Sequence, residues 1–179
     1  AVSGQGIRML RETGIEVTTG VLAEDGELLN EVYFHNQRTG RPFVHLKLAS
    51  TLDGRIAMPD GHSQWITGNL AREHGHRLRA THMAIAVGAG TVRHDNPSLT
   101  VRLPDYFGPQ PKRVIFSKSG NIPQDCRLLS DADAGRTRTF IGTSLDDALA
   151  MLYQDGICNL LIEGGAGLAT AFLKSGQVQ

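Results

Sequence analysis

The chain has 179 residues, a length that suits one domain or one domain plus a fragment. Its 18 lysines and arginines balance 18 aspartates and glutamates, so there is no bulk positive field to attract nucleic acid, and recognition of phosphate must come from local clusters. The sequence shows no apolar run near the roughly 20 residues that span a bilayer, no signal-peptide pattern and only two isolated cysteines, which points to a cytoplasmic protein without a membrane partner.

The first part of the chain, up to about Gly40, carries two helical patterns. Gly14 is a stop signal after the first of them, and a Thr-Gly-Arg-Pro sequence follows the second. In chain order we expect a helix at 6–12, a short strand at 15–17, a helix at 23–37 and a turn or linker at 39–42.

From Phe43 onward, strand-like runs alternate with helical patterns, which favours a largely parallel sheet with crossover helices. Ser144 is a suitable N-cap, and Asp146 and Asp147 complement the dipole of the helix that follows. No strand follows the last helix, so we expect a domain truncated at its C-terminus. The expected strands are 43–50, 83–88, 113–117, 138–141 and 157–162, and the expected helices are 69–80, 90–95, 144–155 and 168–174.

Two glycine-rich turns each follow an expected strand. Glu163-Gly164-Gly165-Ala166-Gly167 lies between a strand and a helix, where bare glycines let backbone N–H groups reach a phosphate and the helix N-terminus adds partial positive charge. Gly88-Ala89-Gly90-Thr91 has the same arrangement. Either turn alone is more typical of an ordinary tight turn, but two of them in one small α/β chain favour a nucleotide ligand.

Polar and aromatic side chains gather between these turns. Arg79, Arg93 and Arg102 are suited to bidentate phosphate contacts, although a surface arginine is normally a solvated charge. Trp65, the only tryptophan, either stacks on a flat ring or anchors a core or lid. Asp95-Asn96-Pro97 favours a turn whose side chains bond the backbone or a ribose hydroxyl.

Neither a metal site nor an activated nucleophile is indicated. His74 and His76 are two residues apart and so point to different sides of a helix. There is no zinc-deaminase motif, no Gly-x-Ser-x-Gly elbow and no Cys–His pair with motif support. Nucleotide-cradling turns without these features fit chemistry supplied by a bound cofactor, and hydride transfer from a nicotinamide is the natural candidate.

Five segments together form a highly specific set: KLASTLDGRIA at 47–57, GHSQWIT at 61–67, GxGT at 88–91, DNPxLTxR at 95–102 and IEGG at 162–165. They resemble the reductase domain of the bifunctional riboflavin-biosynthesis deaminase/reductases, and the likeness covers nearly everything from Phe43 onward. In the first part, GxGIxML at 4–10 and LNExxFH at 29–35 resemble the tail of the deaminase domain of the same family. The resemblance implies a deaminase tail and linker over 1–41 and a truncated reductase domain over 42–179.

The resemblance implies a dihydrofolate-reductase-like α/β fold, with a mostly parallel sheet flanked by helices. It also implies NADPH-dependent reduction of 5-amino-6-(5-phosphoribosylamino)uracil to 5-amino-6-(5-phosphoribitylamino)uracil by a homodimer or higher oligomer. Zinc would belong only to a deaminase part upstream of this chain, so deamination is not expected here. The NADPH positions carried over by motif are Ala49, Trp65, Thr91, Asp95, Ser117 and the turn 165–171 with Gly165, Ala166 and Gly167; the substrate positions are Ser63, Arg79, Leu99, Arg102 and Glu163.

A proton must also reach the carbonyl oxygen as the hydride arrives. Lys47 and Asp53 are candidates by position, but either can instead shape the loop, and water can donate. Two other interpretations stay open: a catalytically inactive assembly fragment, and a related NADPH reductase acting on another pyrimidine- or pterin-like substrate.

Overall fold

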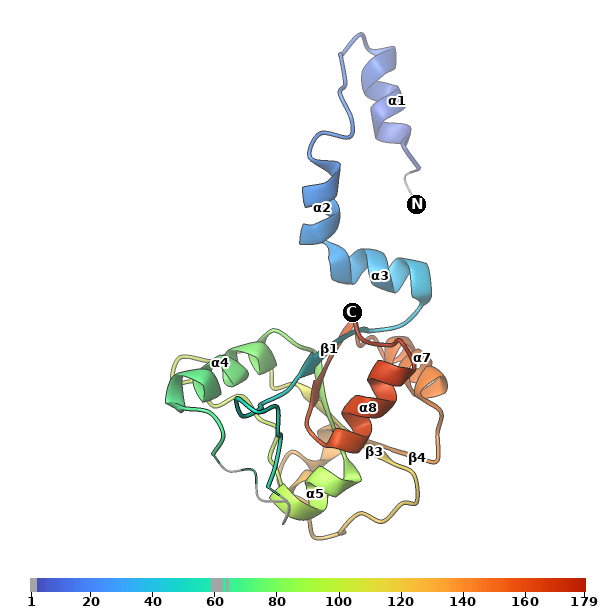
Figure 1. Cartoon of the computed structure of the whole chain (residues 1–179). Helices are drawn as coiled ribbons and strands as arrows, with labels where there is room; N and C mark the ends of the chain where they lie inside the picture. Colours follow the sequence, from blue (N-terminus) through green and yellow to red (C-terminus); the bar gives the residue numbers. More distant parts are fainter. Residues whose placement is uncertain (1–2, 59–62, 64) are drawn as a thin grey trace.

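One parallel five-stranded sheet forms the centre of the molecule. The computed structural model describes residues 3–58, 63 and 65–179. The strands lie in the order β1-β5-β2-β3-β4, and all four neighbouring pairs are parallel, as the alternation of strands and helices predicts (Figure 1). They are β1 (Phe43–Lys47), β2 (Ala84–Gly88), β3 (Lys112–Ser117), β4 (Thr137–Ile141) and β5 (Asn159–Glu163).

Helices cover both faces of this sheet, which explains why the inner strands β2 and β5 are apolar on both sides. Along β2, Ala84 and Ala86 belong to the core under α7 and α8, whereas Ile85 and Val87 belong to the opposite core. The first face carries α7 (Leu145–Gln154) and α8 (Ala166–Lys174); the second carries α4 (Asn69–Ala80), α5 (Ala89–Asp95) and α6 (Arg127–Ser130). Among the described residues, no helix is both long and apolar enough to span a bilayer.

The position of β5 creates a crevice at one edge of the sheet. Although β5 is the last strand in the chain, it lies between β1 and β2. The helices that follow the neighbouring strands β2 and β5 run to opposite faces, because α5 packs in one core and α8 in the other. Such a switch point at the carboxyl ends of parallel strands is where open α/β sheets bind ligands.

The first three helices extend away from the sheet (Figure 1). They are α1 (Gln5–Glu12), α2 (Ala23–Leu29) and α3 (Glu31–Thr39), and the first two bury no residue. α3 is attached to the sheet through Asn36, whose side-chain amide donates to the carbonyls of Arg41 and Cys158 at 2.7 and 2.9 Å.

Two expectations for this region were wrong. Residues 15–17 form no strand, since this largely exposed segment has no neighbouring strand in the described chain to pair with. The expected helix at 23–37 is two helices that meet at Asn30. The Asn30 side chain donates to the carbonyl of Gly26 at 2.9 Å and its backbone leaves helical geometry, which is how asparagine commonly ends a helix.

The other expected elements are present with shifted ends. β1 ends at Lys47 rather than at residue 50, and α8 begins at Ala166 rather than at residue 168. Ser144 is the N-cap of α7, since its Oγ accepts from the N–H of Asp147 at 3.1 Å. The connection between β3 and β4 holds two short elements that the sequence did not predict, α6 and a 3₁₀ turn, Ala134–Arg136.

A buried arginine fixes this connection. Arg113 on β3 is 0% exposed, and its guanidinium forms a bidentate ion pair with Asp131 at 2.7 and 2.8 Å. It also donates to the carbonyls of Ser98 and Leu128 at 3.3 and 3.0 Å, and to Thr137 Oγ1 at 3.0 Å. Hydrogen bonding to this guanidinium lowers the pKa of Asp131 below its ordinary value.

We expect Asp131→Asn to lower the free energy of unfolding by about 3 kcal/mol, because it leaves a buried guanidinium without its counter-charge. Since the pKa of Asp131 is lowered in the folded state, its stabilisation is complete above the pKa of the unfolded chain and is lost as the pH falls through the folded pKa. Urea unfolding should therefore show a gap between wild type and variant that is constant near neutrality and shrinks below about pH 4. A gap that does not change with acidification would contradict this role.

Candidate functional site

A large cleft lies at the carboxyl ends of the strands. Its volume is about 890 Å³, and it opens over the ends of β1, β5 and β2, where Lys47, Glu163 and Val87 line it. The register pairs Lys47 with Glu163, so these two side chains point to the same face of the sheet. Residues of α4 and of the segment 95–104 complete its walls.

This cleft brings together most of the residues that the sequence singled out. Those that line it are Lys47, Ala49, Ser63, Trp65, Arg79, Thr91, Asp95, Leu99, Arg102, Glu163 and Gly165. Asp53, Ser117, Ala166 and Gly167 are not among the lining residues, and neither is Arg93, whose guanidinium donates to the carbonyl of Asn121 at 2.6 Å. Sequence reasoning missed three cationic or basic lining residues, Arg72, His76 and Arg127, because none belongs to a glycine turn or to a motif used above.

The two glycine turns lie side by side at one end of the cleft. Gly165 has φ +84°, and a Cβ built there would lie 3.0 Å from Thr91 Oγ1. A side chain at this position would therefore be both strained and crowded. Gly165 is also the N-cap of α8, whose first N–H groups have no partners within the helix. The turn is thus bare backbone at a helix N-terminus, which fits an anionic group such as a pyrophosphate.

Arg79 and Glu163 form the most buried ion pair of the cleft. The Arg79 Nε and one terminal nitrogen donate to the two carboxylate oxygens at 2.6 and 2.8 Å, and the two side chains are only 15% and 10% exposed. The other terminal nitrogen donates to the carbonyl of Thr100 at 2.9 Å. The pair therefore ties α4 to the end of β5 and to the segment that follows α5.

Arg102 lies further along the same wall, and its guanidinium forms fewer hydrogen bonds than that of Arg79. Its backbone N–H donates to His76 Nδ1 at 3.2 Å, and its guanidinium donates to Thr100 Oγ1 at 3.1 Å. Burial, followed by the positive charges of Arg79 and Arg102, lowers the pKa of His76 below its ordinary value, so His76 is neutral at pH 7 and can accept this hydrogen bond.

The backbone of the wall is held in unusual conformations. Asn96 and Leu99 have φ values of +39° and +52°, a region that side chains rarely adopt. Leu99 is buried in the core beneath α5 and also lines the cleft. Non-glycine residues in this region cost about 1–3 kcal/mol and persist only where the surroundings hold them, as they do at binding sites.

Trp65 has an exposed ring that lines the cleft, whereas Asp53 lies outside the lining residues. The Trp65 side chain is 71% exposed, which excludes a core anchor, and the Arg72 guanidinium lies 4.5 Å from its ring centre. Asp53 is in an exposed turn, where its carboxylate accepts from the hydroxyl of Thr51 and from Arg55. The Thr51 hydrogen bond lowers the pKa of Asp53, so this group is ionised at pH 7 and has no proton to donate.

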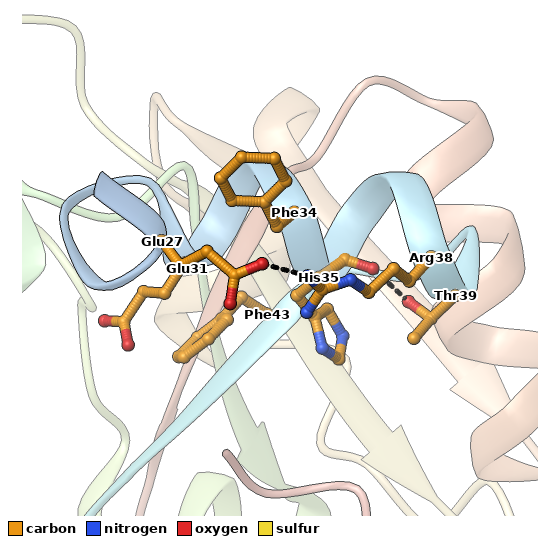
Figure 2. Close-up of a pocket in the computed structure, with 7 residues that line it drawn as sticks. All are labelled: Glu27, Glu31, Phe34, His35, Arg38, Thr39 and Phe43. Carbon is orange, nitrogen blue, oxygen red and sulfur yellow. Dashed lines mark hydrogen bonds and ion pairs between the residues drawn. The ribbon is translucent and has the colours of Figure 1, made fainter. Parts of the chain in front are cut away.

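A second hollow, of about 290 Å³, lies where α2 and α3 meet the beginning of β1 (Figure 2). Two of its charged residues, Glu27 and Arg38, are paired with each other at 2.6 Å, and Phe34 and Phe43 supply apolar walls. None of the residues assigned to cofactor or substrate lines it. Across residues 3–58, 63 and 65–179, no group of three or more His, Cys, Asp or Glu side chains is arranged to hold a metal ion.

Comparison with known proteins identifies relatives over nearly the whole chain. Residues 42–179 match the family described as the RibD C-terminal domain. The chain is 39% identical over 202 residues to the riboflavin biosynthesis protein RibD of Bacillus amyloliquefaciens, covering 98% of this chain and 53% of that protein. It is 41% identical over 182 residues to RibD of Mycobacterium tuberculosis, covering 99% and 52%. The chain therefore spans about half the length of the curated relatives it matches.

Solved structures give the same picture. RibD of Acinetobacter baumannii superposes with a TM-score of 0.81 at 34% identity, covering 98% of this chain and 54% of that one. A Thermotoga maritima protein described as a diaminohydroxyphosphoribosylaminopyrimidine deaminase/5-amino-6-(5-phosphoribosylamino)uracil reductase gives 0.79 at 36% identity, covering 97% and 53%. This likeness confirms the expected dihydrofolate-reductase-like α/β fold.

We expect Glu163→Gln to lower the free energy of unfolding by about 3 kcal/mol, because it leaves the largely buried Arg79 without a counter-charge. Glu73→Gln is the matched control. Glu73 pairs with Arg77 on the exposed surface of α4, where an i,i+4 pair contributes only about 0.5 kcal/mol. Urea unfolding of both variants measures the difference. Equal losses of unfolding free energy would show that the Arg79–Glu163 pair stabilises the fold no more than the exposed pair does.

Proposed function

The chain belongs to the RibD C-terminal domain family, and on that premise we propose that it is a reductase of riboflavin biosynthesis. The specific reaction we propose is the NADPH-dependent reduction of 5-amino-6-(5-phosphoribosylamino)uracil to 5-amino-6-(5-phosphoribitylamino)uracil. The observation that carries this proposal is that one cleft unites both glycine turns with Arg102. A pyrophosphate cradle and a cationic wall in the same cavity suit a phosphorylated cofactor beside a phosphorylated substrate.

The proposed cofactor side of the cleft is formed by the two glycine turns. The backbone at Gly165 would hold the pyrophosphate at the start of α8, with Thr91 beside it. NADPH, when bound, supplies the hydride. Since a Cβ at Gly165 would crowd the Thr91 side chain, only glycine lets the two turns lie this close together with the backbone left bare. The remaining proposed NADPH positions are Ala49, Trp65, Asp95, Ser117, Ala166 and Gly167.

The substrate side follows the opposite wall. Arg102 keeps most of its guanidinium donors available for a phosphate, whereas Arg79 uses three of its five N–H groups on Glu163 and Thr100. We therefore assign the main phosphate contact to Arg102, with Arg79 holding Glu163 in place for the substrate. Ser63 and Leu99 are the other proposed substrate contacts.

Lys47 and Asp53 are the two protein candidates for the group that gives a proton to the carbonyl oxygen, and Lys47 is the better placed of the two. Lys47 lines the cleft at the end of β1, beside Glu163, and can hold an ammonium proton near a bound substrate. Asp53, outside the lining residues and ionised, is the weaker candidate, and a water held in the cleft is the alternative donor. A cytoplasmic location and a homodimer or higher oligomer also remain proposals.

The proposed function is tested by mixing the purified chain with NADPH and the phosphoribosylaminopyrimidine. We expect loss of NADPH absorbance and a product two hydrogen atoms heavier than the substrate by mass spectrometry. Binding of NADPH without turnover would favour a reductase for another pyrimidine- or pterin-like compound. If fluorescence titration shows that the chain does not bind NADPH, the result would favour an inactive assembly fragment.

Within this function, Arg102→Ala should raise KM for the phosphorylated substrate at least about tenfold, because a charge-assisted hydrogen bond contributes about 1.5–3 kcal/mol. KM for NADPH should stay nearly constant. Steady-state kinetics with each reactant varied in turn gives both values, and Arg77→Ala on the outer surface of α4 is the control. Equal weakening of both reactants would refute the assigned role.

Gly165→Ala should weaken NADPH about tenfold or more, because its Cβ would meet Thr91 Oγ1 at 3.0 Å and its φ of +84° is strained for alanine. Gly26→Ala is the matched control, since Gly26 has space for a Cβ and lies in α2, away from the cleft. Fluorescence titration with NADPH measures both variants. Unchanged affinity in Gly165→Ala would argue against this turn as the pyrophosphate site.

A further inference from the structure

We propose that Arg127, from the short helix α6, joins Arg102 to form a two-arginine subsite for the phosphate group of the substrate. Arg127 belongs to none of the motifs that assign the other site residues. The identity of the ligand rests on the proposed function, whereas the subsite itself rests on the geometry of the two arginines.

Arg127 reaches the cleft from a distant part of the chain. It lies in the connection between β3 and β4, yet it lines the same cavity as Arg102 and Asn96. Its backbone N–H donates to Asn96 Oδ1 at 2.8 Å. Asn96 is the residue with φ +39° that ends α5, so one of the strained residues of the cleft wall also holds α6 in position.

The other side of Arg127 is fixed by the core. The next residue, Leu128, is fully buried, and its carbonyl accepts from Arg113 at 3.0 Å and from Thr137 Oγ1 at 2.6 Å. The backbone of Arg127 is therefore held both from the cleft and from the core. A guanidinium presented from a fixed backbone loses less freedom on binding than one on a mobile loop.

The charges around Arg127 favour an anion. Among residues 3–58, 63 and 65–179, no carboxylate forms an ion pair with Arg127 or with Arg102. Burial is the main cause that lowers the pKa of Arg102, followed by the charge of Arg79; Glu163 opposes the shift, and the charge of Arg127 makes a smaller contribution that places the two guanidinium groups in the same neighbourhood. Two neighbouring cations that no carboxylate pairs with repel each other, and a phosphate dianion between them would reduce that repulsion and accept donors from both.

The cleft as a whole also has more positive than negative side chains. Although the chain has no net charge, the described residues that line this cavity include five cationic side chains and three acidic ones, and Glu163 is paired with Arg79. The cationic side chains are Lys47, Arg72, Arg79, Arg102 and Arg127; the acidic ones are Glu73, Asp95 and Glu163.

A phosphate monoester is present in both proposed ligands, as the sugar phosphate of the substrate and as the 2′-phosphate of NADPH. We assign the subsite to the substrate, because Arg127 lies beside the segment that presents Arg102, whereas the Gly165 turn and Thr91 form the cofactor cradle.

The experiment measures ribose 5-phosphate binding to the whole chain by calorimetry, alongside KM for the full substrate and for NADPH. Arg127→Gln should weaken ribose 5-phosphate and raise KM for the substrate at least about tenfold, with NADPH unchanged. Arg127→Lys should recover part of this loss, because it keeps the charge but not the planar fork. Arg138→Gln is the control, since Arg138 lies on β4 and pairs with Asp155 outside the cleft. Thermal unfolding should show that every variant is folded.

The outcomes separate the subsite from the proposed function. If the wild type binds ribose 5-phosphate in an Arg127-dependent way but reduces no substrate, the subsite stands and the proposed reaction fails. If the wild type reduces the substrate and Arg127→Gln changes neither KM nor ribose 5-phosphate binding, the subsite is overturned. A loss confined to NADPH and absent with NADH would overturn the assignment to the substrate, because the pair would then bind the cofactor's 2′-phosphate.

Discussion

The insertion of β5 between β1 and β2 is the constraint on which the site depends. It places Glu163 beside Lys47 and sends α5 and α8 to opposite faces, which opens the crevice. The three central residues of the strand, Leu160, Leu161 and Ile162, are apolar and buried, and both neighbouring strands come from earlier parts of the chain. Neither the floor of the cleft nor the meeting of Gly165 with Thr91 exists until this long-range pairing is made, so formation of the site and completion of the sheet are one event.

Two buried arginines then hold the wall that faces this floor. Arg113 donates to the carbonyl of Ser98 from below, and Arg79 donates to the carbonyl of Thr100 from α4. The residue between those two carbonyls is Leu99, which has φ +52°. A backbone this unfavourable needs fixed partners on both sides, and the two guanidinium groups, each neutralised by its own carboxylate, supply them. Stability of the core and shape of the substrate wall are therefore coupled.

Local patterns predicted the parts of this structure that local forces decide. Apolar runs and turn glycines located all five strands, and the Ser144 cap was visible from its neighbours. The break at Asn30 was missed because helical spacing of apolar residues continues through it, while the side-chain bond that ends the helix does not depend on that spacing. The motifs located most of the residues that line the cleft. They did not predict that Arg79 and Glu163 form an ion pair, because the two residues are 84 positions apart and meet only through the strand order.

Four arginines in and behind the walls of the cleft divide into two groups by whether a carboxylate pairs with them. Arg79 and Arg113 each bind a carboxylate bidentately and at least one backbone carbonyl, so most of their donors are used within the fold. Arg102 and Arg127 have fixed backbones, but no carboxylate pairs with either among the described residues, so their positive charge is directed to the cavity. All four look alike in the sequence. What separates them is the strand order and the side-chain bonds that it permits, and this is why a chain without net charge can still present a strongly cationic cleft to a phosphorylated ligand.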